Sequence, residues 1–161
     1  MMCRLALSLA LAACGAPTRE QPTPTQTPAP LPTVTPSPIV AAGSAEEAAQ
    51  IVRRYQALLA DRDYAGAHAL WEPQAAVSAE AFERGFAGYA SYQATVGAPS
   101  RVEPGAGQRY VTVPVTIRGK RQDGTAVNQR VEVILHRVAE EIDGATADQK
   151  RWGIREVRAA P

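Results

Sequence analysis

The sequence predicts an α+β fold in which three helices are followed by a curved antiparallel sheet of about four to five strands. Apolar residues recur with helical spacing as far as residue 89, and after it they alternate with polar residues. Turn sequences at 119–125 and 143–144 separate the alternating runs. The first 43 residues follow neither pattern, so we expect the folded domain to span 44–161.

Residues 1–13 are predicted to be an export signal. Arg4 precedes nine small or apolar residues, a run too short for a permanent membrane span of about 20 residues. The quartet LAAC at 11–14 resembles the lipobox of bacterial lipoproteins. That resemblance implies cleavage before Cys14 and attachment of a diacylglycerol to its sulfur. An ordinary secretory signal with an incidental cysteine is the alternative.

Lipidation at Cys14 would anchor the domain at the cell membrane or the outer membrane, facing the periplasm or the exterior. Each methylene of an acyl chain that is buried in the bilayer contributes about 0.8 kcal/mol to membrane binding. One chain therefore binds a protein to the membrane only marginally, whereas two chains anchor it stably. Loss of residues 1–13 would remove Cys3, so the mature chain would have one sulfhydryl and no disulfide. It would also remove Arg4 and leave basic and acidic residues in equal number, which gives no support for nucleic-acid binding.

Residues 14–43 are predicted to be a lipidated N-terminus followed by a disordered tether. Eight of the 13 prolines lie between 15 and 43, together with six threonines. Proline favours an extended chain without a core, which could reach roughly 90 Å. A spacer that lifts the domain off a membrane is favoured over a ligand for SH3-type domains, whose partners are mostly cytosolic.

Three polar residues mark the predicted helix starts. Ser44, with Glu47 three residues later, has the spacing of a capping box. Asp63 can cap a short second helix that ends before Pro73, and Ser78 can cap a third. The predicted apolar faces contain Ala48, Ile51, Val52, Tyr55, Leu58 and Leu59 in the first helix, Tyr64, Ala67, Leu70 and Trp71 in the second, and Phe82, Phe86 and Tyr89 in the third.

Strands are predicted at 110–117, around 131–135 and at 151–157, with a weaker one at 91–96 that 100–104 continues or follows. Pro114 should mark an edge or a bulge, because proline donates no ladder hydrogen bond. Trp152 and Ile154 are expected to point inward from the last strand.

The run AQIVRRYQALLADRDYAGAHALW, at 49–71, resembles the opening of the ketosteroid-isomerase-like group, also called the nuclear-transport-factor-2-like or cystatin-like cone fold. The resemblance covers most of 44–158 in element order. It implies helices packed on a bent sheet with a pocket between them, and many members dimerise through the sheet. In the isomerase branch a tyrosine donates to the oxyanion and an aspartate moves the proton.

Tyr55 falls at the place of that tyrosine, but Ala79 occupies the place of the aspartate. Without a general base, proton transfer is slow, so we predict no catalytic residues. Tyr55, Trp71, Phe86 and His136 are candidates for lining a pocket. The two histidines form no cluster with zinc spacing, and neither a metal nor a cofactor is expected.

Three functions remain open at this point. The leading one is a lipid-anchored binding or accessory domain without catalysis. The second is an isomerase, dehydratase or hydrolase of small apolar molecules that uses Tyr55 and a further polar group such as His136. The third is homodimerisation over the sheet face as a structural role. The basic turn at 118–121 could touch lipid phosphates, although a solvated turn requires fewer assumptions.

Overall fold

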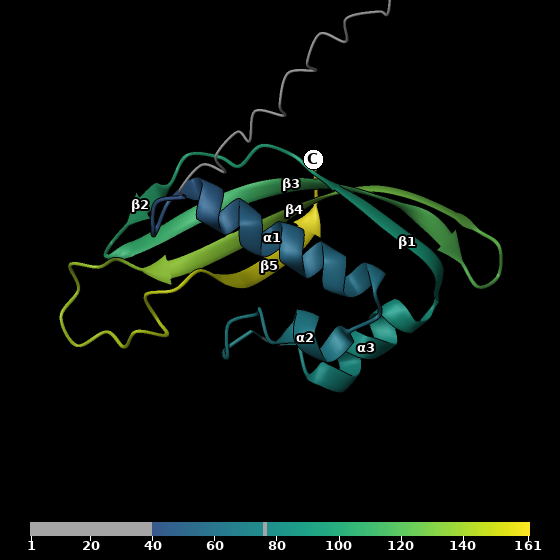
Figure 1. Cartoon of the computed structure of the whole chain (residues 1–161), viewed down its shortest axis with the longest axis horizontal. Coiled ribbons are helices and arrows are strands. Elements are labelled where there is room, and N and C mark those ends of the chain that lie inside the picture. Colours follow the sequence, from purple (N-terminus) through teal and green to yellow (C-terminus); the bar gives the residue numbers. More distant parts are fainter. Residues whose placement is uncertain (1–39, 76) are drawn as a thin grey trace, which may run out of the picture. The chain divides into compact units, whose positions relative to one another are not determined.

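Three helices lie on one face of a curved antiparallel sheet in the computed structural model, which describes residues 40–75 and 77–161 (Figure 1). The helices are α1 (Ala45–Ala60), α2 (Tyr64–His68) and α3 (Ala79–Ala87). The α+β class predicted from the sequence is therefore confirmed. Helix α1 packs on the first and third strands, and α2 connects it to α3.

Each helix begins at the polar residue that the sequence predicts as its cap. Ser44, Asp63 and Ser78 accept hydrogen bonds from backbone N–H groups three residues later, at 3.2, 2.8 and 3.2 Å. The carboxylate of Glu47 accepts a hydrogen bond from the backbone of Gly43, one residue before the cap. The glutamate of the capping box therefore bonds to the residue before the cap instead of to the cap itself. The two side chains still satisfy backbone donors at the start of α1.

The sheet contains five strands in the order β1-β3-β4-β5, with β2 paired to the start of β3. The strands are β1 (Tyr89–Val96), β2 (Glu103–Gly105), β3 (Gln108–Arg121), β4 (Ala126–Val138) and β5 (Gly153–Ala159). All strand pairs are antiparallel. β3 and β4 extend well beyond the predicted limits, since the alternating pattern continues into polar sequence near the connecting turn.

The turn between β3 and β4 depends on a glycine. Gly124 has a φ of +87°, a conformation that glycine adopts without strain. Its N–H donates to the carbonyl of Arg121 at 3.0 Å, and the Arg121 N–H donates to Thr125 at 2.8 Å. This turn projects at one end of the sheet, and the loop from β4 to β5 lies at the other end (Figure 1).

Pro114 does not lie in an edge strand, contrary to one form of the prediction. It lies in β3, which has neighbours on both sides. The β1 ladder ends at the pair Val96–Val115, and Gly97 then donates to the Pro114 carbonyl at 2.8 Å. Pro114 therefore lies between the parts of β3 that pair with β1 and β2, where a missing N–H leaves no ladder position empty.

A short extended segment covers part of the free edge of β5. Trp71 forms an isolated parallel bridge with Ile154. The Ile154 N–H donates to Leu70, and the Glu72 N–H donates to Ile154, each at 2.9 Å. The chain leaving α2 is thereby fixed to the last strand.

The core lies between α1 and the inner face of the sheet. Residues on that face alternate along each strand, as a period of two requires. Its fully buried members on the sheet are Val111, Val113, Val115, Val133, Leu135 and Ile154. Trp152, directly before β5, is 6% exposed, so the predicted inward direction of Trp152 and Ile154 is confirmed. No helix within the described ranges has the length and apolar character needed to cross a membrane.

Candidate functional site

An aromatic cluster occupies the space between the helices and the sheet. Tyr55 of α1 lies with its ring centroid 6.3 Å from Trp71 and 6.2 Å from Phe82. The ring centroid of Phe82 also lies 6.1 Å from that of Trp71 and 5.0 Å from that of Phe86. Three of the four predicted pocket residues, Tyr55, Trp71 and Phe86, are therefore brought into one cluster, with Phe82 at its centre.

Tyr55 lies in a setting that keeps its phenol protonated. The side chain is 2% exposed, and burial raises the pKa of the phenol well above its usual range. The nearby Trp71 indole offsets part of this rise, although its N–H lacks the geometry of a hydrogen bond and has no partner among the described residues. Aromatic rings surround the phenol, and neither a carboxylate nor an imidazole is hydrogen-bonded to it in the described part of the chain.

The residue that the family resemblance places at the general base is the first residue of α3. Ala79 opens this helix, and Glu80 in its first turn is exposed. A carboxylate at the start of a helix is stabilised by the backbone N–H groups there, so Glu80 has a structural explanation. Ala79 itself has only a methyl side chain, which cannot transfer a proton.

A buried amide was missed by the sequence reading. Gln56 is 6% exposed, and its Oε1 accepts a hydrogen bond of 2.6 Å from the hydroxyl of Tyr92 in β1. Burial also raises the pKa of Tyr92, with smaller contributions from Tyr55 and Tyr89. The spacing of Val52, Gln56 and Leu59 places the amide on the core face of α1, which was the available signal.

His136 does not join the aromatic cluster. Because the adjacent Leu135 is fully buried on the inner face, His136 lies on the outer face of the sheet. Its Nδ1 contacts the carboxylate of Glu72, and its Nε2 contacts the side-chain oxygen of Gln108. The ring centroids of Tyr110 and His136 lie 5.0 Å apart.

The His136 group is a polar bridge between distant segments. The side chains of His136 and Glu72 are 13% and 14% exposed, and Arg155 lies 3.6 Å from the second oxygen of Glu72. Both nitrogens of the imidazole are engaged, so neither is open to a substrate. No group of three or more His, Cys, Asp and Glu side chains in residues 40–75 and 77–161 is arranged to hold a metal ion.

None of the predicted pocket residues lines either of two hollows in the described structure. One hollow, of about 60 Å³, lies between the end of α1 and the start of β1, and its walls include Arg62, Tyr89 and Tyr92. This volume is far below the 300–1,000 Å³ typical of ligand pockets. The other, of about 360 Å³, opens on the outer face of the sheet between Thr95, Thr116 and Arg130.

Comparison with known proteins identifies the fold. No protein-family model and no curated protein matches the sequence. Among solved structures, the chain is similar to a nuclear-transport-factor-2-like superfamily protein from Salmonella enterica serovar Typhimurium, with 10% identity, a TM-score of 0.53, and 72% of this chain and 89% of that chain covered.

Two further structures support the same assignment. One, from Xanthomonas campestris, is described as a calcium/calmodulin-dependent protein kinase II association domain (16% identity, TM-score 0.52, covering 78% of this chain and 94% of that chain). The other, from Streptomyces avermitilis, is described as a dehydratase of the nuclear-transport-factor-2-like family (14% identity, TM-score 0.50, covering 73% of this chain and 94% of that chain). The chain therefore has the nuclear-transport-factor-2-like fold. Identity this low establishes the fold alone.

The predicted signal at 1–13, the lipidated Cys14 and the tether lie outside the described residues, apart from the end of the tether at 40–43. Lipidation, membrane attachment and location stay predictions.

Proposed function

We propose that this protein is a lipid-anchored, extracytoplasmic domain with a binding or accessory role and no catalytic activity of its own. The anchor rests on the LAAC sequence at 11–14, and the distance from the membrane rests on the proline-rich tether. One structural observation supports the absence of catalysis. Aromatic rings fill the space around Tyr55, and the position of the base is Ala79.

The anchor is tested by mass spectrometry of protein from natively expressed membranes. We expect an N-terminal peptide that begins at Cys14 and carries a diacylglycerol mass. An unmodified thiol at Cys14, or an intact Met1, would refute the anchor. Replacement of Cys14 by Ala should abolish both the diacylglycerol mass and the peptide that begins at residue 14.

The absence of catalysis is tested with enolisable substrates such as Δ5-ketosteroids. We expect no turnover above the buffer rate for the full chain. Turnover that is abolished by Tyr55→Phe would refute this part of the proposal, because this substitution removes only the phenolic oxygen. Phe82→Leu, which changes the cluster without touching a phenol, is the matched control.

A small-molecule dehydratase or isomerase is the second candidate, supported by the likeness to the structure described as a dehydratase. It requires a cavity of a few hundred cubic ångströms beside Tyr55. The tight contacts between Phe82 and its neighbours argue against such a cavity, since the rings would have to move apart before a substrate could enter.

Homodimerisation through the sheet is the third candidate. The helices cover the inner face, and the half-buried side chains of Thr112 and Ile134 lie on the outer face. Light scattering of the full chain in detergent tests this role. A strict monomer at high concentration would exclude it.

A further inference from the structure

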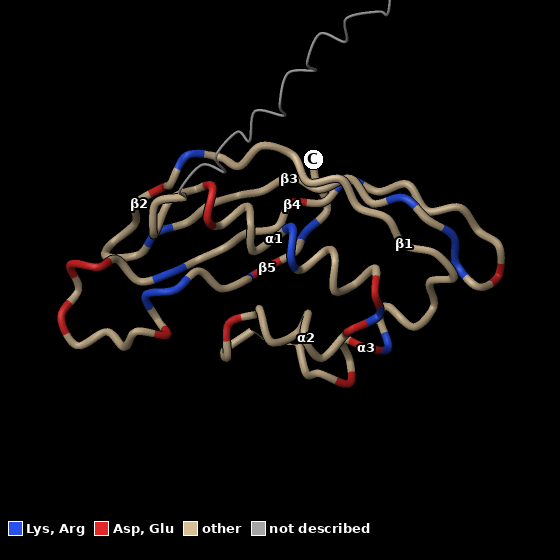
Figure 2. Tube along the Cα trace, viewed as in Figure 1, with Lys and Arg blue, Asp and Glu red and all other residues tan. Residues whose placement is uncertain are grey.

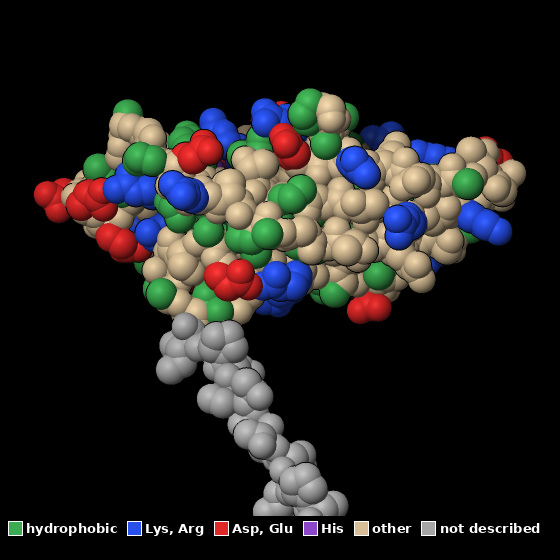
Figure 3. All heavy atoms as spheres, turned by 90° about the horizontal axis from the view of Figure 1, so that it is seen from above, with side chains coloured by type: hydrophobic (Ala, Val, Ile, Leu, Met, Phe, Trp, Pro, Cys, Tyr) green, Lys and Arg blue, Asp and Glu red, His purple; other side chains and the backbone are tan. Residues whose placement is uncertain are grey.

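The outer face of the sheet carries three basic side chains near the β3–β4 turn. Arg118 and Lys120 flank Gly119 in β3, and they point away from the core because Ile117 is buried. Arg130 of β4 lies opposite Thr116, diagonally across from Arg118. All three side chains are exposed. We call this group the basic face. Figure 2 shows basic residues gathered along this end of the hairpin, and Figure 3 shows basic side chains, in blue, at the same end of the molecule.

The basic face has no counterions among the residues that the structure describes. Elsewhere in the described structure, six arginines and His136 lie within 4 Å of a carboxylate. None of the three residues of the basic face does so within residues 40–75 and 77–161. The one acid of the turn, Asp123, caps it by accepting a 2.9 Å hydrogen bond from the Thr125 N–H. Three like charges are therefore held together on paired strands, and the carboxylate of the turn is engaged by the backbone.

The open hollow of about 360 Å³ adjoins the basic face. Arg130 lines this hollow together with Thr95, Thr116 and Pro114. Its one carboxylate, that of Glu132, is already neutralised by Arg158, whose Nε and Nη2 donate to it at 2.9 and 2.8 Å. The free charge at the hollow is thus positive. An anionic group attached to a small uncharged body fits this combination of a free guanidinium and an open depression.

We propose that the basic face docks on the headgroups of anionic phospholipids. This inference rests on the proposed function, because a lipid anchor would hold the domain within reach of a bilayer. A bilayer presents many phosphates in one plane, so Arg118, Lys120 and Arg130 can be neutralised together. Each basic residue near such a surface strengthens binding about fivefold, so three give about a hundredfold. A gain of this size gives only weak binding for a protein free in solution. It is sufficient for a tethered protein, because the tether keeps its effective concentration at the membrane high.

Docking would fix the orientation of the domain. The basic face would lie against the membrane, while α2 and α3, on the opposite face of the sheet, would point away from it. The anchor alone sets a maximum distance, whereas the basic face would set a direction.

The experiment is co-sedimentation of the full chain, purified without lipidation, with vesicles of phosphatidylcholine alone or with about 30% phosphatidylglycerol. We expect binding to rise with phosphatidylglycerol and to fall with added salt. The uncleaved leader is common to all variants, so binding to phosphatidylcholine alone serves as the baseline. Because lipidation is not needed, this test can fail while the anchor at Cys14 is confirmed by mass spectrometry, and the reverse also holds.

The decisive variant is Arg118→Glu/Lys120→Glu/Arg130→Glu, and its matched control is Arg54→Glu/Arg84→Glu/Arg101→Glu. The control changes net charge equally at exposed arginines of α1, α3 and the segment after β1, none of which is in an ion pair within the described residues. We expect the first variant to lose the phosphatidylglycerol-dependent part of binding, a drop of about a hundredfold or more, and the control to keep most of it.

Three results would overturn the proposal. The wild-type chain could show no dependence on phosphatidylglycerol. Both triple variants could lose binding equally, which would mean that only net charge matters. Soluble polyphosphate could bind the basic face as tightly as the vesicles do, which would make a dissolved polyanion the partner. Circular dichroism and unfolding curves of both variants establish that any loss of binding occurs in a folded protein.

Discussion

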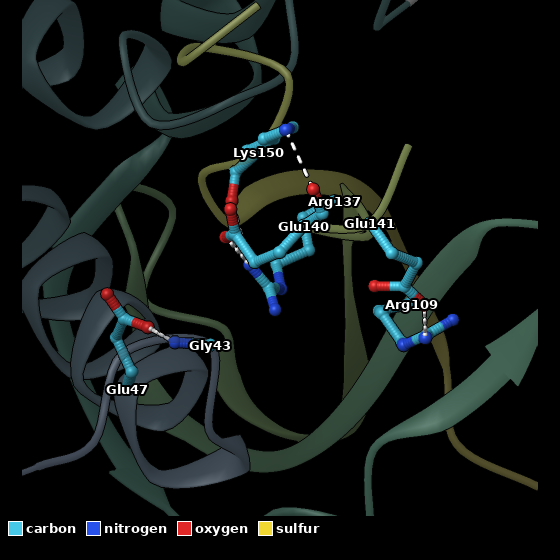
Figure 4. Close-up of polar contacts among 7 residues, drawn as sticks. All are labelled: Gly43, Glu47, Arg109, Arg137, Glu140, Glu141 and Lys150. Carbon is cyan, nitrogen blue, oxygen red and sulfur yellow. Dashed lines mark hydrogen bonds and ion pairs between the residues drawn. The ribbon is translucent and has the colours of Figure 1, made fainter. Parts of the chain in front are cut away.

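The two ends of the sheet use arginine in opposite ways. At the end with the β4–β5 loop, Arg109 and Arg137 each pair with a glutamate of the loop (Figure 4). Arg151 pairs with Asp148 of the same loop. At the end with the β3–β4 turn, Arg118 and Arg130 pair with none in the described structure. The acids of the loop and the bases of the turn are visible at the two ends of the trace in Figure 2.

This difference in arginine pairing follows from the interactions that hold each end in place. The loop between β4 and β5 has few apolar residues, so ion pairs and hydrogen bonds fix its course; Lys150, for example, donates to the Glu140 carbonyl at 2.8 Å. At the turn end, the β3–β4 pairing continues without a register shift to Lys120, and tyrosines of β1 form contacts that hold this end. Tyr92 bonds to Gln56, and Arg121 stacks on Tyr89 with its guanidinium carbon 4.9 Å from the ring centre. Neither Arg118 nor Arg130 forms an ion pair or a side-chain hydrogen bond with the described residues, which leaves both side chains available for another role.

The largest expected effect is at Arg137. Its side chain is 11% exposed, contacts Glu140 at 2.6 Å, donates to the Lys150 carbonyl at 3.0 Å and lies 5.3 Å from the Trp152 ring centre. Arg137→Ala should lower the free energy of unfolding by about 2–3 kcal/mol, because hydrogen bonds and a partly desolvated cation–π contact are lost together. Urea denaturation measures this.

Arg151→Ala is the control on the same loop. Its ion pair with Asp148 is largely solvated, with side chains 76% and 81% exposed, and its loss should cost less than about 0.5 kcal/mol. Equal effects of the two substitutions would contradict the structural role assigned to Arg137.

At the turn end, the expected effect of Tyr92→Phe is about 1–2 kcal/mol of unfolding free energy. The substitution removes the 2.6 Å hydrogen bond and leaves the Gln56 oxygen buried without its donor. Tyr89→Phe is the control, since its hydroxyl makes no hydrogen bond within the described residues. A Tyr92→Phe protein as stable as the wild type would show that the turn end is held by something else.

The two buried tyrosines also predict how stability changes in alkali. Burial raises the pKa of Tyr55 and Tyr92, so the folded state holds their protons more tightly than the unfolded state does. This stabilisation is complete below the unfolded pKa of about 10 and is lost as the pH rises above it. Denaturation curves from about pH 8 upward should stay level to about pH 10 and decline beyond it, and Tyr92→Phe should make this decline shallower. A flat profile would contradict the burial of these phenols.

A smaller effect is expected for the ion pair of Arg109 with Glu141. Its side chains are 25% and 62% exposed, so a double-mutant cycle with Arg109→Gln and Glu141→Gln should give a coupling of about 0.2–1 kcal/mol. Salt should reduce this coupling, because the pair is open to solvent. A coupling above about 2 kcal/mol would mean that the loop end is more rigid than its exposure suggests.

The smallest effect on stability is expected for the basic face. Arg118→Gln/Lys120→Gln/Arg130→Gln should change the free energy of unfolding by less than about 0.5 kcal/mol, or raise it slightly, since the repulsion among three like charges is removed. Thermal unfolding at low and high salt measures this. A marked loss of stability would show that these side chains hold the hairpin and would remove the contrast between the two ends.

The sequence predicts the parts of this fold that local chemistry determines. The three caps, the helix order and the alternation of Val111, Val113 and Val115 depend on near neighbours, and each is confirmed. The sequence also predicts that the rings of the aromatic cluster are buried, because Tyr55, Trp71 and Phe86 lie on predicted apolar faces. That these rings would pack on Phe82 depends on the angle between α1 and α3, which no local pattern encodes.

The group around His136 could not be predicted in the same way. Its partner Glu72 lies 64 residues away, and the β4–β5 register shifts between Ile134 and Leu135, so counting along the strands misplaces the pairing. One signal was present. Gly153 interrupts a predicted strand, and a side chain there would meet the Glu72 Cγ at 2.8 Å. Glycine within a strand indicates the close approach of another group, and here that group is the carboxylate that reaches His136.

The short bridge from Trp71 to Ile154 has a consequence for crowded surfaces. An uncovered border of a sheet invites identical chains to join through their backbones and grow into fibres. Here the backbone of Leu70 and Glu72 already occupies the hydrogen-bonding positions of Ile154 on that border, and Arg155 and Arg158 follow it. Many copies could therefore sit side by side without cross-β polymerisation starting from this strand.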